Sequence, residues 1–212
     1  MKIIFYIRSI MKIKKLIFLL ALPALLSCNL KTEGQSTDTV DRIKQSEQAF
    51  VKKGPESPGE FLRSIPFSVT TTNIADYPDG IIPFSNLEKP DQDIPNLKNG
   101  TDIIINEKVI TVIIDYPVRD QYRFDLRSDT GFTRALLLKK ISEAYYKMYE
   151  EEEASATVKT IPVEKRTTIY NRNETNGKYG IWGHDIADLV LSGVDVYKGK
   201  DGKIVVTLGI ES

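Results

Sequence analysis

The stretch from Phe132 to Glu153, FTRALLLKKISEAYYKMYEEEE, decides the fold. Its apolar residues recur at spacings of three and four, the period of one face of an α-helix. That face consists of Leu137, Ile141, Ala144, Tyr145 and Met148, and it is widened by Leu136 and Tyr149. The pattern predicts one long helix, over about residues 132–153, that buries this face against another layer.

The predicted helix ends in four successive glutamates, Glu150–Glu153. Acidic side chains at the C-terminus of a helix oppose its macrodipole. Such a run could attract a cation or a basic partner. The preferred interpretation is a solvated, frayed helix end.

Strand patterns precede the helix. Two β-branched runs, Ile103–Ile105 and Val109–Asp115, flank three polar residues and predict a hairpin. The second run is apolar on both faces, as expected of a central strand. Tyr122–Arg127 alternates strictly, which predicts a strand that buries Tyr122, Phe124 and Leu126.

A second hairpin is predicted after the helix. Leu189–Tyr197 and Lys203–Ile210 flank a turn-rich connector, residues 198–202. Alternation predicts one buried face with Ile204, Val206, Leu208 and Ile210, and Ser192-Gly193 indicates a bulge. The order of elements predicts an α+β fold, an antiparallel sheet of hairpins with the long helix packed on one face.

Residues 73–100 lack clear periodicity and contain four prolines. Long irregular stretches of this kind are often functional in compact domains. The alternative is a solvated excursion with one short strand.

The segment Asn176–Leu189, NGKYGIWGHDIADL, contains the only His and the only Trp of the chain. One hypothesis makes His184 a general base or a metal ligand, with Asp185 or Asp188 orienting its ring. A helical turn would place His184 and Asp188 on one face, and Asp185 could cap that turn. The preferred hypothesis is a structural junction, in which Trp182 fills the core and His184 bonds a loop carbonyl.

The composition excludes several classes of function. Cys28 is the only cysteine, so the chain cannot form an internal disulfide or a thiolate cluster. One His gives no usual zinc site, and Pro95 interrupts the calcium-loop pattern that begins at Asp91. We therefore expect no metal and no cofactor.

The start of the chain is typical of a secretory signal. Lysines at positions 12, 14 and 15 precede an apolar run, residues 16–26, and then Ser27. This run is shorter than the roughly 20 residues of a membrane span. Residues 1–27 are therefore predicted to be a cleaved signal peptide, with Met11 as an alternative start. Its five basic residues would be lost, so the mature protein would be about five charges negative and is not expected to bind nucleic acid.

Leu25-Leu26-Ser27-Cys28 resembles the lipobox of bacterial lipoproteins. That resemblance implies cleavage before Cys28 and attachment of diacylglycerol, and usually of a further acyl chain such as palmitate, to this residue. Two or more chains hold a protein stably on a bilayer. Residues 28–58 would form the lipidated tether, with a short helix near residues 39–53, and residues 59–212 a single α+β domain.

The segment Tyr179–Ile186, with the tyrosine-rich helix before it, is also similar to a pattern in uncharacterised lipoproteins of flavobacteria. The two resemblances imply a cell-envelope protein. Asn29 follows Cys28, and no dense acidic cluster of the kind used for surface export comes after it. We therefore favour anchoring in the outer membrane with the domain facing the periplasm, and the cell surface is the alternative. No motif of a known enzyme class occurs.

Two functions remain open. The favoured one is a non-enzymatic binding domain for a partner protein, a glycan or a toxin, with Tyr179, Trp182 and His184 as contact residues. The alternative is a periplasmic hydrolase or other enzyme that uses His184 with Asp185 or Asp188.

Overall fold

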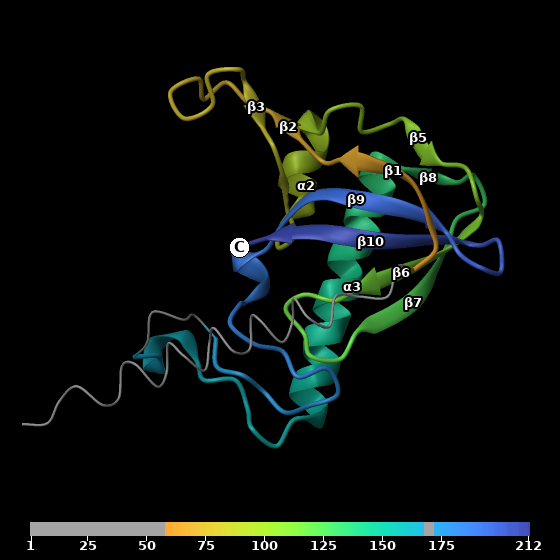
Figure 1. The fold of residues 1–212 in the computed structure, drawn as a ribbon. Helices are drawn as coiled ribbons and strands as arrows, with labels where there is room; N and C mark the ends of the chain where they lie inside the picture. Colours follow the sequence, from red (N-terminus) through yellow and green to blue (C-terminus); the bar gives the residue numbers. More distant parts are fainter. Residues whose placement is uncertain (1–57, 168–171) are drawn as a thin grey trace, which may run out of the picture. The chain divides into compact units, whose positions relative to one another are not determined.

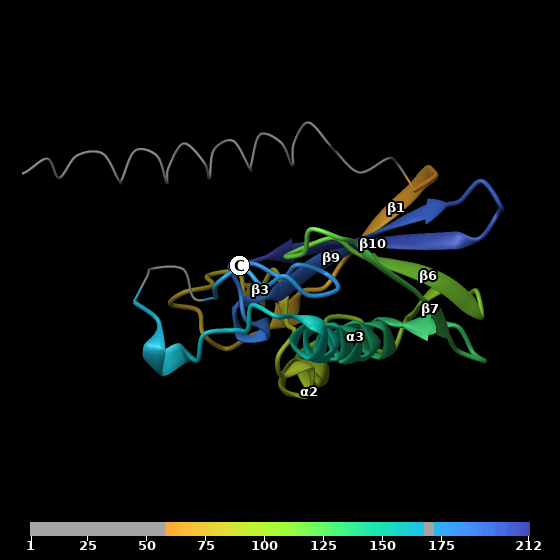
Figure 2. The same cartoon turned by 90° about the horizontal axis from the view of Figure 1, so that it is seen from below.

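The computed structural model describes residues 58–167 and 172–212, and these belong to one compact unit, Pro55–Ser212. Cys28, the predicted signal peptide and nearly all of the predicted tether lie outside the described residues. The described residues have an α+β fold: one long helix lies against one face of a mostly antiparallel sheet (Figures 1 and 2).

Helix α3 (Arg134–Ser155) confirms the predicted long helix. It begins two residues later than expected because Phe132 and Thr133 form the short strand β8 (Phe132–Thr133). Thr133 also caps the helix, since its side chain accepts a hydrogen bond from the amide of Leu136 at 3.1 Å. Most of the predicted apolar face is buried as expected: Leu137, Ile141, Ala144, Tyr145, Met148 and Tyr149. Leu136, which was predicted to widen this face, is half-buried.

The main sheet has the strand order β1–β9–β10–β6–β7. The short strand β4 pairs with residues 190 and 191 at the start of β9, and β1 pairs with residues 193–198 of the same strand. All of its pairs are antiparallel except β10 with β6, which is parallel. The strands are β1 (Glu60–Pro66), β4 (Ser85–Asn86), β6 (Val109–Ile114), β7 (Tyr122–Arg127), β9 (Val190–Lys198) and β10 (Ile204–Glu211).

The predicted hairpin of residues 103–105 with residues 109–115 is wrong. Strand β5 (Ile103–Ile105) pairs with β8 instead. Strand β6 is a central strand, as its two apolar faces predicted, and both of its edges are taken by β7 and β10. No edge of β6 therefore remains for β5.

The C-terminal hairpin is confirmed, because β9 and β10 pair along their length. The predicted bulge is confirmed as well: Gly209 pairs with Gly193 and Ile210 with Leu191, so Ser192 is the extra residue. The predicted buried faces are only partly buried. Leu208 and Ile210 are half-buried, and so are all three apolar residues of β7, since β7 lies at an edge of the sheet.

Residues 73–100 are folded into small elements. A two-stranded sheet, β2 (Val69–Thr70) with β3 (Ile81–Ile82), is followed by α2 (Pro90–Asp93) and the 3₁₀ turn η1 (Ile94–Asn96). Two further 3₁₀ turns, η2 (Val163–Lys165) and η3 (Ile186–Asp188), follow helix α3. Within the described ranges, no helix has the length and apolarity to cross a membrane.

Candidate functional site

Glu152, near the C-terminal end of α3, holds the start of the segment Asn176–Leu189 in place, where Gly177 and Gly180 lie. Its side chain is completely buried. One carboxylate oxygen accepts hydrogen bonds from Thr175 Oγ1 at 2.6 Å and from the amide of Gly177 at 2.8 Å. The other accepts from the amides of Tyr179 at 2.7 Å and Gly180 at 3.2 Å. The prediction of a solvated, frayed helix end is therefore wrong for Glu152.

These four donors also determine the charge of Glu152. Burial acts to raise its pKa, because water is removed from the carboxylate. The hydrogen bonds from Thr175 and from the three backbone amides stabilise the charged form and bring the pKa below its ordinary value. Glu152 is thus an ionised anchor at neutral pH.

The glutamates on either side of Glu152 also accept hydrogen bonds from residues that follow the helix. Glu151 accepts hydrogen bonds from Lys178 Nζ at 2.8 Å and from the Tyr179 hydroxyl at 2.5 Å. Hydrogen bonds from Lys178 and Tyr179 lower the pKa of Glu151. Glu153 accepts from Thr160 Oγ1 at 2.9 Å. The acidic run therefore binds a basic residue of its own chain.

Two of the glycines in this segment are required by close approach. A Cβ atom on Gly177 would lie 2.5 Å from the Glu152 carbonyl oxygen and 2.6 Å from its carboxyl carbon. Gly180 has a φ of 64°, and a Cβ there would meet the side chain of Arg119. Gly177 is thus required by the side chain and backbone of Glu152, and Gly180 by its positive φ and by Arg119.

The segment brings the rings of Trp182 and His184 next to that of Tyr116, which follows β6. We call these three rings the aromatic site. The ring centroids of Tyr116 and Trp182 lie 5.2 Å apart, edge to face, and those of Tyr116 and His184 lie 5.6 Å apart. All three side chains are half-buried. Ser212 adds a hydroxyl, 3.0 Å from the Tyr116 hydroxyl and 3.4 Å from His184 Nε2.

The buried face of α3 fixes the backbone beneath the aromatic site. The Tyr149 hydroxyl donates to the carbonyl of His184 at 2.8 Å, and the Tyr145 hydroxyl donates to the carbonyl of Tyr116 at the same distance. The amide of Trp182 donates to the carbonyl of Pro117 at 3.1 Å. The rings therefore project from a rigid base.

The carboxylates that were predicted to orient His184 make other bonds. Asp185 accepts from Arg166 at 2.5 and 3.2 Å and from Arg172 at 3.5 Å. Asp188 accepts from the amide of Asp185 at 2.9 Å, in the turn η3 that Asp185 caps as expected. Within residues 58–167 and 172–212, no hydrogen bond joins either carboxylate to the imidazole. For the hydrolase hypothesis, His184 therefore has a hydroxyl nearby, that of Ser212, but neither Asp185 nor Asp188 orients its ring by a hydrogen bond.

Each predicted contact residue has a definite place. His184 and Trp182 are half-exposed at the aromatic site, so Trp182 does not fill the core as the junction hypothesis required. Tyr179 is buried, and Ile181 also takes a core position. Tyr116 and Ser212 were missed, because they lie about 65 or more residues upstream and nearly 30 downstream of Trp182 and His184 in the sequence. Only the pairing of distant strands brings them here.

Other parts of the described chain offer little for metal chemistry. Among these residues, no group of three or more His, Cys, Asp or Glu side chains could hold a metal ion. Two shallow hollows flank β1, and His184 lines neither of them.

Comparison of the chain with protein-family models, with curated proteins and with solved structures gives no significant match.

Replacing Glu152 with Gln should destabilise the domain by about 2–4 kcal/mol at pH 7, because an amide NH₂ would face backbone N–H groups that have no other acceptor. A lowered carboxylate pKa stabilises the fold above the unfolded pKa of about 4.3, and this contribution is lost as the pH falls through the folded pKa. Urea unfolding from pH 7 to 3 should therefore show the difference shrinking in acid.

Glu150→Gln is the matched control, since Glu150 lies on the same helix end and is exposed. It should leave the free energy of unfolding nearly unchanged. Equal effects of the two substitutions would contradict the role given to Glu152.

The imidazole of His184 should titrate below about 6.5, its ordinary pKa. Burial lowers the pKa of His184 more than the nearby carboxylates of Asp188 and Asp185 raise it. Because the unfolded ring takes up a proton first, this residue should make the fold less stable as the pH drops below about 6.5. The chain has one His, so its ring signals in an NMR titration are unambiguous. A midpoint above 6.5 would mean that a carboxylate does control the ring.

Proposed function

We propose that the protein is a membrane-anchored lipoprotein of the bacterial cell envelope whose folded domain binds a partner without catalysis. The lipobox pattern ending at Cys28 and the polar residues after it support the anchor and the tether. Asn29 after Cys28, with no dense acidic cluster following it, supports placement on the outer membrane, facing the periplasm. The observation that carries the binding function is the aromatic site, with its half-exposed rings on a rigid base.

Several contacts favour binding over hydrolysis. His184 is held through its backbone by Tyr149, while Asp185 is engaged by two arginines. Arg172 is itself buried, and its guanidinium lies 5.0 Å from the centre of the Tyr149 ring. The interactions of Asp185 therefore serve to fix the loop, and catalysis by His184 would have to proceed without a hydrogen bond to Asp185.

Of a partner protein, a glycan and a toxin, the aromatic site favours a glycan. A sugar ring has an apolar C–H face and a rim of hydroxyls. The faces of Trp and Tyr side chains pack against such apolar surfaces, and their polar tips accept or donate hydrogen bonds at the rim. The hydroxyls of Tyr116 and Ser212 and the imidazole of His184 lie beside the rings and supply further polar groups.

Replacing Cys28 with Ser should release the protein from membranes, because the acylated thiol would be lost. Metabolic labelling with a palmitate analogue and fractionation of the envelope measure the two effects. Loss of label and a shift to the soluble fraction are expected together. A labelled or sedimenting Ser variant would refute lipidation at this residue.

Trp182→Ala should reduce glycan affinity by at least about tenfold, since stacking on this ring would be lost. Trp182 is the only Trp, so its fluorescence reports directly on the aromatic site. The full chain in detergent is titrated with soluble α-glucan, β-glucan, mannan and xylan, and a blue shift of emission marks binding. The variant has no Trp to follow, so its affinity is compared with that of the unchanged protein by electrophoresis through gels that contain the same polysaccharides, where binding slows migration.

Tyr146→Ala is the control, because Tyr146 is an exposed aromatic residue on α3 outside the aromatic site. Its retardation should match that of the unchanged protein. If none of the polysaccharides alters the emission of Trp182, the proposed glycan function fails.

A further inference from the structure

A separate surface lies along β1, the strand at one end of the main sheet. Six of its seven residues are exposed, and only Ile65 is buried. Among the described strands, none pairs with the edge of β1 that faces away from β9. Open sheet edges are templates for the addition of another strand, and proteins usually cover or blunt them.

The register shows which backbone groups this edge presents. The amide of Phe67 donates to the carbonyl of Ser192 on β9 at 2.9 Å. Because the direction of the backbone groups alternates along an antiparallel strand, Ile65 also faces β9, while Ser64 and Pro66 face outward. The carbonyl of Pro66 confirms this direction, since it accepts a hydrogen bond from Arg134 at 3.0 Å. The N–H and C=O of Ser64 thus point to the open side.

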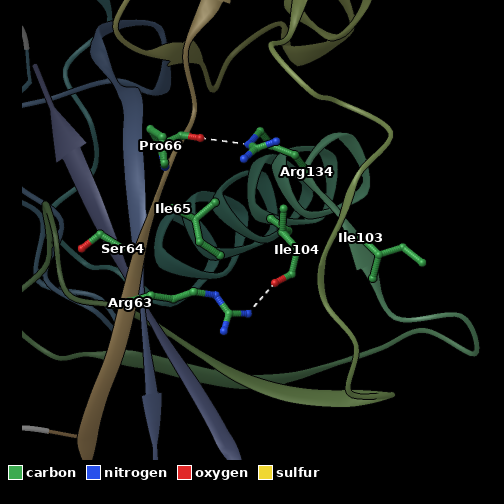
Figure 3. Close-up of a pocket in the computed structure, with 7 residues that line it drawn as sticks. All are labelled: Arg63, Ser64, Ile65, Pro66, Ile103, Ile104 and Arg134. Atoms are coloured by element: carbon green, nitrogen blue, oxygen red, sulfur yellow. Dashed lines mark hydrogen bonds between the residues drawn. The ribbon is translucent and has the colours of Figure 1, made fainter.

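A hollow of about 400 Å³ lies on this open side, between β1 and β5 (Figure 3). Ile65, Pro66 and Ile104 give it apolar walls, and Ile103 beside them is 56% exposed. Two further apolar side chains of β1, Phe61 and Leu62, are exposed next to it along the strand. An uncovered apolar surface beside an unpaired strand edge is typical of a peptide-binding groove.

Two arginines stand at the hollow, and both use backbone carbonyls as partners. Arg63 Nη2 donates to the carbonyl of Ile104 at 2.6 Å (Figure 3). Arg134 Nη1 donates to the carbonyls of Lys98 and Asn99 at 3.1 and 2.8 Å. Neither guanidinium forms a salt bridge with any carboxylate of the described ranges. Each has five N–H groups, so donors remain on both. Within the described ranges, the hollow therefore carries two positive charges that no carboxylate pairs with.

We propose that this hollow binds an extended, acidic segment of a partner protein, which adds as a strand to β1 at Ser64 and pairs its carboxylates with Arg63 and Arg134. Backbone pairing supplies affinity, and the arginines select acidic side chains at alternate positions. The surface is distinct from the aromatic site, and the proposal does not depend on glycan binding.

Fluorescence polarisation with two labelled peptides, (Glu-Val)₄ and (Lys-Val)₄, tests the proposal on the full chain in non-ionic detergent. Only the acidic peptide should bind. Arg63→Gln should weaken its binding by about tenfold, because a charge-assisted contact is lost. Arg123→Gln is the matched control, since Arg123 is an exposed arginine on β7 at the other end of the sheet. It should have no effect.

Ser64→Pro separates strand addition from simple charge attraction. It removes the outward N–H and leaves every charge in place, and an edge strand tolerates Pro where the N–H faces solvent. Binding of (Glu-Val)₄ should again fall by about tenfold. If this variant does not fold, slower hydrogen exchange of the Ser64 amide on peptide binding to the unchanged chain replaces it.

Several outcomes would overturn the proposal. Absence of binding, equal binding of the two peptides, or equal effects of the Arg63 and Arg123 substitutions would each do so. Unchanged binding by Ser64→Pro, or an unprotected Ser64 amide, would exclude strand addition. If the Cys28→Ser chain instead binds phosphatidylglycerol vesicles through Arg63 and ignores the peptide, the surface contacts a membrane.

Discussion

The buried carboxylate of Glu152 connects helix α3 to residues 175–180, which lie between the helix and the C-terminal hairpin. One side chain at the end of α3 accepts four hydrogen bonds from residues 175–180, and these bonds set the path of a segment that has little regular secondary structure. A buried carboxylate without partners would be strongly unfavourable, so the segment and the helix end depend on each other. Trp182 and His184 follow directly after this segment, and their positions depend on the same anchor.

The aromatic site shows how the sheet and the helix cooperate. Tyr116 follows β6, Ser212 follows β10, and these two strands are the parallel pair of the sheet. Parallel strands that lie side by side bring their C-terminal ends to the same edge. Beneath that edge, Tyr145 and Tyr149 extend from the buried face of α3 and bond the backbone of the site. The apolar stripe therefore does more than fill the core, since two of its members also position the surface rings.

The sequence predicted the elements that depend on local periodicity. The helix, the C-terminal hairpin and the bulge at Ser192 follow from patterns within about 20 residues, and the structure confirms them. The pairing of β5 with β8 could not be predicted in this way, because it depends on which strands already occupy the edges of β6. The same holds for Glu152, because the three other glutamates of the run, Glu150, Glu151 and Glu153, give no sign in the sequence of which one points inward. The close glycines at 177 and 180 were the available signal that something large had to fit against this backbone.

Helix α3 also sets the distance between the two surfaces. Arg134 is its first residue, beside β1, and Tyr149 supports the aromatic site four turns further along. At 1.5 Å per residue the two positions are about 22 Å apart along the helix axis. Two molecules bound at positions this far apart need not overlap, so a single copy of the domain has room for both at once. The length of α3 therefore sets how closely two molecules bound at these positions can approach each other.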